Sequence, residues 1–217
     1  MTYIVPKKVY YIHIPKAGGT TEKYKLKELY GNDMKEVTTG KHSPYDKQYA
    51  DYDCIYTHVR NPHDRLLSIY LFWFELKFMP QKHITDKRID FMQYEHKQRI
   101  SQNFGHYMGG MSKFDTMLYN KITPLIQDNN PENYYKWLDT VGKANDEMDC
   151  FFEYRPWLQQ HLWLADNVFV KKIEDEGGEK LNITSRMPEH DDNDYLQIGK
   201  PLIEKYYKED LERFGYE

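Results

Sequence analysis

A lysine followed by two glycines and two threonines gives the N-terminal part of the chain the residue types that hold an anion. The segment Tyr10–Tyr24, YYIHIPKAGGTTEKY, predicts a short strand, a turn and the start of a helix. Gly18 and Gly19 let backbone N–H groups at the helix N-terminus approach a phosphate or sulfate closely. Lys16 adds a positive charge. The loop is not a Walker A motif, because the lysine of that motif follows its glycines.

A second segment places further polar residues at the end of a strand. Asp53–Tyr70, DCIYTHVRNPHDRLLSIY, begins as an apolar strand, breaks at an Asn-Pro pair and continues as a helix. Arg60 stands at the carboxyl end of this strand, and Ser68 lies about two helical turns further on. In an open α/β sheet, ligands gather at the carboxyl ends of the strands. The two segments therefore predict two anion sites on one ligand.

Together these segments resemble the 5′-phosphosulfate and 3′-phosphate binding motifs of sulfotransferases that use 3′-phosphoadenosine 5′-phosphosulfate (PAPS). The resemblance rests on IPKAGGT and, about forty residues later, on VRNPHDRLLSIY. It is closest to the carbohydrate sulfotransferases, including the heparan sulfate and uronyl 2-O type. It extends more weakly to PWLQQHLWLA, VFVKKIE and YYKEDLERFGY, and so touches most of the chain.

The resemblance implies a site for PAPS as donor and for 3′-phosphoadenosine 5′-phosphate (PAP) as product. Arg60 and Ser68 would bind the 3′-phosphate, and Arg65 would brace the helix. Arg186, in the late loop NITSRMPEH, is either a phosphate ligand or an exposed arginine. The residues that would wrap the 5′-phosphosulfate are Lys16, Ala17, Gly18, Gly19, Thr20 and Thr21.

The reaction also needs a base, because the acceptor hydroxyl must lose a proton. Histidine suits this role near neutral pH. His42, in TTGKHSPYD between the two motifs, is the predicted base, and 2-O-type relatives place a catalytic histidine in the matching interval. The competing candidates are His13, His58 and a carboxylate such as Asp46 or Glu36.

Lys16 would have a second, catalytic role. Sulfuryl transfer resembles phosphoryl transfer, in which positioning and charge stabilisation do most of the work. An ammonium group at the oxygen that bridges phosphate and sulfate would stabilise charge on the departing nucleotide. The chain has no CxxC or HExxH pattern, so we expect no metal. Glu22 and Lys23 depart from the family, whose members often have an apolar residue there.

The composition is compatible with one α/β domain over residues 1–217. The net charge of −4 argues against general nucleic-acid binding, for which a basic domain is expected. No secretory signal or membrane-spanning segment is apparent, which predicts a soluble intracellular protein, as in a bacterium or a virus. Cys54 and Cys150 are accordingly expected to be reduced.

Strands and helices are predicted to alternate along the chain. Lys180–Tyr195 is expected to be mostly loop. This alternation predicts a parallel, doubly wound sheet flanked by helices, with a P-loop-like strand–loop–helix at the donor site. The predicted strands cover 9–14, 54–59 and 168–173, and the predicted helices cover 21–30, 64–78, 115–126, 131–144 and 198–214.

We therefore expect a sulfotransferase that moves a sulfuryl group from PAPS to an acceptor hydroxyl on a carbohydrate by in-line displacement. A P-loop-like nucleotide kinase is one alternative, but it would require a Walker lysine and a magnesium-binding acid. A non-catalytic sugar- or nucleotide-binding protein of the same fold is another. Such a protein would need neither Lys16 nor Arg60.

Overall fold

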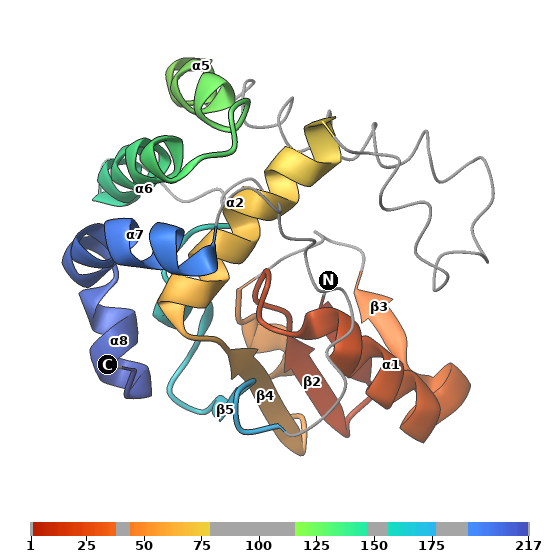
Figure 1. The fold of residues 1–217 in the computed structure, drawn as a ribbon. Helices are drawn as coiled ribbons and strands as arrows, with labels where there is room; N and C mark the ends of the chain where they lie inside the picture. Colours follow the sequence, from red (N-terminus) through yellow and green to blue (C-terminus); the bar gives the residue numbers. More distant parts are fainter. Residues whose placement is uncertain (1, 38–43, 79–115, 147–155, 177–190, 217) are drawn as a thin grey trace. The chain divides into compact units, whose positions relative to one another are not determined.

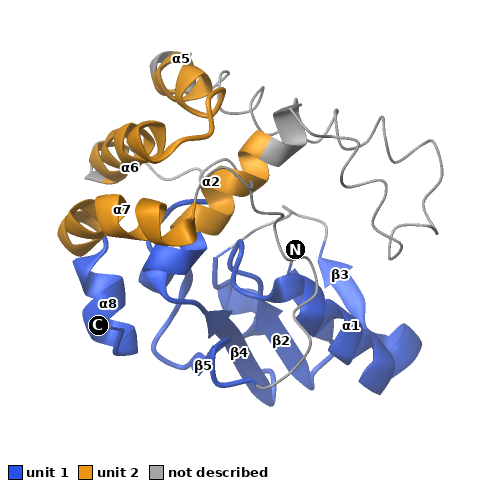
Figure 2. Cartoon of the chain, viewed as in Figure 1, with its two compact units in different colours: residues 1–65, 150–183, 207–217 blue, residues 66–149, 184–206 orange. Residues whose placement is uncertain are grey.

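The computed structural model describes residues 2–37, 44–78, 116–146, 156–176 and 191–216. Within these ranges the chain forms a five-stranded sheet and six α-helices (Figure 1). It divides into two compact units (Figure 2). Unit 1 consists of residues 1–65, 150–183 and 207–217, and unit 2 of residues 66–149 and 184–206. The expectation of one domain over the whole chain stays a prediction.

The whole sheet lies in unit 1. β2, β4 and β5 run parallel to one another, and β1 runs antiparallel to both of its neighbours. β2 and β4 therefore end at the same edge of the sheet, with Ile12 opposite Thr57. In sheet order the strands are β3 (Lys35–Val37), β1 (Thr2–Val5), β2 (Val9–Ile12), β4 (Cys54–Val59) and β5 (Phe169–Lys172).

The expectation of an all-parallel sheet is wrong for β1, which the sequence pattern did not predict. β1 and β2 form a hairpin whose turn has Pro6 in its second position and Lys7 in its third. Lys7 has a φ of 63°, and the N–H of Lys8 donates to the carbonyl of Val5. A proline followed by a residue with positive φ is the geometry of a type II turn, which usually has glycine in the third position. Lysine there concealed the turn.

The two faces of the sheet bury different sets of side chains. α1 (Gly19–Tyr30) crosses one face (Figure 1), where its Leu26 packs with a cluster rich in tyrosine. On the opposite face, Ile14, Ala17 and Val59 pack against Trp163. Alternation of side chains along each strand explains the difference. The first of these clusters contains Tyr3, Val5, Val9, Tyr11, Leu26 and Tyr56.

Unit 2 is helical in the residues that the structure describes, and its core is aromatic. The ring centroid of Tyr70 lies 5.2 Å from that of Tyr134 and 5.6 Å from that of Trp137. Tyr195 packs edge-on against Tyr134 and donates a hydrogen bond to Asn129. The helices of this unit are most of α2 (Pro62–Phe78), α5 (Thr116–Leu125), α6 (Pro131–Asp146) and α7 (Asp192–Tyr206).

The closing helix predicted over 198–214 is two helices. α7 ends at Tyr206, and α8 (Lys208–Phe214) begins after Tyr207, whose φ of −122° and ψ of 21° are not helical. Residues before the break are buried in unit 2, and those after it are buried in unit 1. What looks like one amphipathic helix in the sequence is therefore two helices, and their apolar faces belong to different cores. α7 also begins earlier than expected, within the segment predicted as loop.

A fully buried arginine fixes the start of α2 in unit 1. Arg65 donates hydrogen bonds to the carbonyls of Pro15, Pro156 and Leu158. Burial lowers the pKa of its guanidinium to about 10, against the opposing effect of Asp210, so Arg65 remains charged at neutral pH. The side chain thus ties α2 to the segment before Lys16 and to the segment around residue 157.

Replacing Arg65 with lysine should destabilise the protein by about 2–4 kcal/mol. A single ammonium cannot reproduce the planar fork of donors that serves three carbonyls. Chemical denaturation measures the change in unfolding free energy. Arg213→Lys is the matched control, because Arg213 is 41% exposed and its ion pair with Oδ1 of the exposed Asp166 is as long as 4.0 Å. The control should change stability by less than about 0.5 kcal/mol, and an equally small change in Arg65→Lys would contradict the assigned role.

Candidate functional site

The loop between β2 and α1 contains two residues with left-handed backbone conformations. Lys16 has a φ of 62° and Gly18 a φ of 84°, on either side of Ala17. For lysine this conformation costs on the order of 1–2 kcal/mol, which the surrounding contacts must offset. Ala17 supplies such contacts, because its side chain is fully buried in the core cluster below the loop. Strained turns of this kind cluster at ligand-binding sites.

Both glycines of the loop have close neighbours, and Gly18 also has the positive φ that favours glycine. A Cβ on Gly18 would lie 2.6 Å from Cδ1 of Ile173, and one on Gly19 would lie 1.9 Å from Cδ2 of His13. His13 is buried and stacks against both Tyr3 and Tyr11, with ring centroids 6.1 and 6.3 Å away. His13 therefore fills the space over Gly19, which indicates a structural role for this histidine.

The first turn of α1 is suited to an anion. Gly18 occupies the N-cap position and offers no side chain to cap the helix. The first N–H groups of a helix have no partner within the helix, and the helix dipole gives this end a partial positive charge. Thr20 and Thr21 lie half-buried in the same turn, and Lys16 is half-buried before it. These are the residues expected to hold the 5′-phosphosulfate.

Arg60 lies beside this loop. Its Nη1 is 3.5 Å from the carbonyl oxygen of Lys16. The next residue, Asn61, caps α2: its Oδ1 accepts a hydrogen bond from the N–H of His63, and its own N–H donates to Oε1 of Glu174. The carboxyl ends of β2 and β4 thus bring an anion-type loop and an arginine together in unit 1.

The remaining predicted site residues fall outside this group. Ser68 is buried on α2, in the part of the helix that belongs to unit 2. His42 and Arg186 lie outside the described residues. The two alternative carboxylate bases already have partners. Glu36 on β3 is paired with Lys23 at 3.1 Å, and Asp46 accepts a hydrogen bond from the N–H of Gln48.

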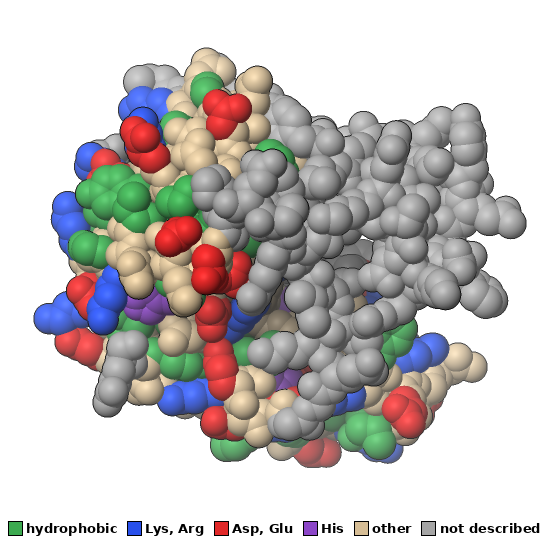
Figure 3. All heavy atoms as spheres, in the orientation of Figure 1, with side chains coloured by type: hydrophobic (Ala, Val, Ile, Leu, Met, Phe, Trp, Pro, Cys, Tyr) green, Lys and Arg blue, Asp and Glu red, His purple; other side chains and the backbone are tan. Residues whose placement is uncertain are grey.

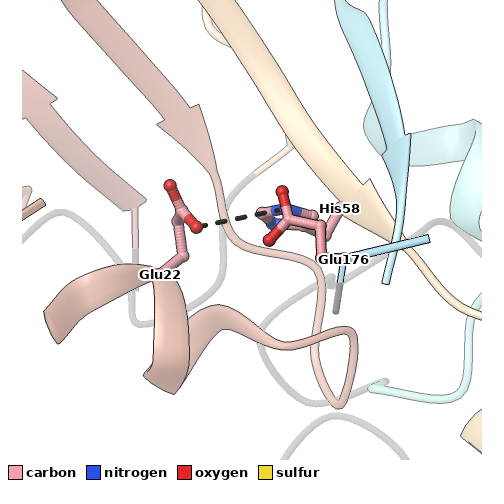
Figure 4. A group of neighbouring side chains, drawn as sticks. All are labelled: Glu22, His58 and Glu176. Atoms are coloured by element: carbon pink, nitrogen blue, oxygen red, sulfur yellow. Dashed lines mark ion pairs between the residues drawn. The ribbon is translucent and has the colours of Figure 1, made fainter. Parts of the chain in front are cut away.

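Below the first turn of α1 lies a buried polar cluster that the sequence analysis did not predict (Figure 4). Figure 4 shows Glu22 of α1 facing His58 of β4, with Glu176 beside the imidazole. Nε2 of His58 is 2.9 Å from Oε1 of Glu176 and 4.0 Å from Oε2 of Glu22. The hydroxyl of Tyr56 donates to the other oxygen of Glu22. The polar pair Glu22–Lys23, at a position where the carbohydrate sulfotransferases that the motifs resemble often have an apolar residue, was the one signal of this cluster in the sequence.

The three ligand-type side chains of the cluster lie close enough together to suggest a cation site. Their potential ligand atoms are all within 4.8 Å of one another. However, Nζ of Lys25 is 2.5 Å from Oε2 of Glu176, and Nζ of Lys171 is 3.6 Å from Oε1. These two ammonium groups balance the charge of the two carboxylates. The cluster therefore acts as an ion-pair network that joins α1, β4 and the segment after β5.

Glu176 makes this network sensitive to acid. Burial raises the pKa of its carboxyl group, but the hydrogen bond from Lys25 and the charges of His58 and Lys25 outweigh burial and lower the pKa to about 2. Since an unfolded glutamate titrates at its ordinary, higher pKa, the unfolded state takes up a proton first as pH falls. The stabilisation is therefore complete above the ordinary pKa of glutamate and is lost as pH falls towards 2.

Glu176→Gln should make stability less dependent on pH in the acid range. The unfolding free energy of the wild type should fall as pH is lowered from 5 to 3. Glu176 should contribute at most about 1.4 kcal/mol per pH unit to this fall, and the variant should lack this contribution. Urea denaturation at several pH values measures the two slopes. Glu209→Gln, which changes a largely exposed carboxylate, is the control and should leave the slope nearly unchanged. Parallel slopes in wild type and Glu176→Gln would contradict the assignment.

Comparison of the chain with models of protein families, with curated proteins and with solved structures gave no match. In the described part of the chain, no helix is long and apolar enough to cross a membrane. On the face shown in Figure 3, described acidic and basic side chains are interspersed, in keeping with the small net charge of −4. The function of the chain is therefore inferred from the geometry of unit 1 and from the sequence motifs.

Proposed function

We propose that this chain is a sulfotransferase that uses PAPS to sulfate an acceptor hydroxyl on a carbohydrate. The observation that carries the proposal is the 3.5 Å approach of Nη1 of Arg60 to the carbonyl of Lys16. It joins a strained, glycine-capped anion loop to an arginine at the end of the neighbouring parallel strand. A nucleotide with a 5′-phosphosulfate and a separate 3′-phosphate has two anionic ends that match these two elements. The motif resemblance supports this donor.

In the proposed reaction, the N-terminus of α1 and Thr20 and Thr21 hold the phosphosulfate. The acceptor oxygen attacks sulfur in line with the bridging oxygen: a new S–O bond forms, the S–O bond to the bridging oxygen breaks, and that oxygen leaves on the phosphate of PAP. His42 takes the proton of the acceptor hydroxyl, and the ammonium of Lys16 stabilises the negative charge on the departing PAP. Arg60 binds the 3′-phosphate end of the nucleotide.

Binding of PAP is the first test of this assignment. PAP at a hundred times its dissociation constant should stabilise the protein by about 2.7 kcal/mol, which is measurable as a rise in melting temperature. ATP with magnesium should give no comparable rise. The reverse result would favour a nucleotide kinase. Transfer of labelled sulfate from PAPS to a panel of glycans, tyrosyl peptides and small alcohols then separates an enzyme from a binding protein. We expect glycans to be the substrates.

Lys16→Met should retain the fold and lose about a hundredfold to a thousandfold in turnover, the usual effect of removing one charge-stabilising donor. Lys7→Met is a closely matched control. Lys7 is also a lysine with a positive φ, 63° against 62° for Lys16, but it lies in the turn that precedes β2 rather than in the loop that follows it. Its loss should leave turnover unchanged. Wild-type turnover in Lys16→Met would exclude the catalytic role.

His42→Ala should leave the affinity for PAP nearly intact and lower turnover by about a hundredfold to ten-thousandfold, as expected for loss of a general base. The wild-type rate should fall at low pH, because protonated imidazole cannot accept the proton, and this limb should vanish in the variant. Steady-state rates across pH and calorimetric binding of PAP provide both readouts. If the variant keeps both the rate and the pH profile of the wild type, the base lies elsewhere.

A further inference from the structure

One buried side chain holds both backbone groups of Arg60. The carboxamide of Gln160 accepts a hydrogen bond from the N–H of Arg60 at 2.9 Å and donates one to its carbonyl at 2.8 Å. Arg60 directly follows β4, so these two hydrogen bonds are made just beyond the last residue that pairs with a neighbouring strand. Gln160 is fully buried. Its amide thus takes the place of a neighbouring strand for a single residue.

Gln160 is itself held in place by a buried carboxylate. Its N–H donates to Oδ2 of Asp210 at 2.6 Å. The other carboxylate oxygen accepts from the N–H of His161 and lies 2.9 Å from its Nδ1. Asp210, on α8, is fully buried. Buried hydrogen bonds of this kind are costly to break, so the carboxamide has little freedom to move.

The arginine side chain gains from this anchoring. Arg60 reaches the edge of the anion loop with a long side chain, whose freedom must be lost when it binds a phosphate. Because the backbone of Arg60 is already fixed, only the side chain loses conformational entropy when the guanidinium binds a phosphate. The unusual feature is that a single side chain satisfies both the donor and the acceptor of this residue, and a residue with a purely packing role has no need to do so.

We propose that Gln160 is a positioning residue that sets the preference of the site for a 3′-phosphorylated nucleotide by fixing Arg60. The inference rests on the proposed function, because it takes Arg60 as the ligand of the 3′-phosphate. It adds a role for a residue that does not touch the nucleotide. Asp210 supports this role by holding Gln160.

The test compares two nucleotides that differ only in the 3′-phosphate, PAP and AMP. Calorimetry gives the dissociation constant of each nucleotide. The dissociation constant of AMP divided by that of PAP measures the selectivity for the 3′-phosphate. Wild-type protein should bind PAP at least about tenfold more tightly than AMP, and Arg60→Ala should remove this preference. Gln160→Met, which keeps the length of the side chain and removes both hydrogen bonds, should lower the ratio by about tenfold and leave the affinity for AMP unchanged.

Two further measurements separate positioning from a general loss of stability. Thr57→Val removes a buried hydrogen bond to the carbonyl of Ile12 in the same sheet, and it should lower stability without changing the ratio. Hydrogen exchange of the Arg60 amide should be faster in Gln160→Met than in the wild type, even without a nucleotide. If Gln160→Met does not fold, Asp210→Asn should lower the ratio in the same direction by weakening the hold on Gln160.

The possible outcomes distinguish this inference from the proposed function. A wild-type protein that binds PAP no more tightly than AMP overturns both the donor assignment and the positioning role. A selective wild type with an equally selective Gln160→Met, or Asp210→Asn in its place, overturns the positioning role alone. The positioning role is supported if Gln160→Met loses selectivity and shows faster exchange of the Arg60 amide, while Thr57→Val stays selective.

Discussion

The burial of one positive charge, the guanidinium of Arg65, is the constraint on which the arrangement of unit 1 depends. A charge removed from water is costly unless its hydrogen bonds are satisfied, and here three backbone carbonyls from two separate segments satisfy them. One of these carbonyls belongs to Pro15, the residue before Lys16. The position of the loop between β2 and α1 relative to the start of α2 is therefore fixed by an interaction that no ligand needs to supply.

Asp210 complements this charge within the same interior. It raises the pKa of Arg65 against the effect of burial, and it binds the N–H groups of Gln160 and His161. Through Gln160, this carboxylate is connected by hydrogen bonds to the backbone of Arg60. Such a network contributes more to a defined geometry than to net stability, because desolvation offsets much of the attraction.

The elements with strong local patterns could be predicted from the sequence, and those defined by distant partners could not. β4 matches its predicted bounds, Cys54–Val59, because it is an apolar run closed by Asn-Pro. β1 was missed because lysine replaces glycine in its turn, and β3 because three residues carry no periodic signal. The motifs singled out Lys16 and Arg60, which the structure brings together, and their roles stay predictions. Gln160, Asp210 and Glu176 come from distant segments and have no local signature, so their contacts became visible only in the fold.

The order of segments in unit 1 has a consequence for how the protein folds. Four of its five strands precede unit 2 in the chain, and β5 comes between the two segments of unit 2. The carboxylate that secures Gln160 lies on α8, after the whole of unit 2 has been made. Contacts between residues so distant in sequence are slow to form, because a long loop must close before they contribute. During synthesis, the sheet therefore exists for some time without its last buried partner. The Arg60 turn should accordingly be among the last parts of unit 1 to acquire native protection.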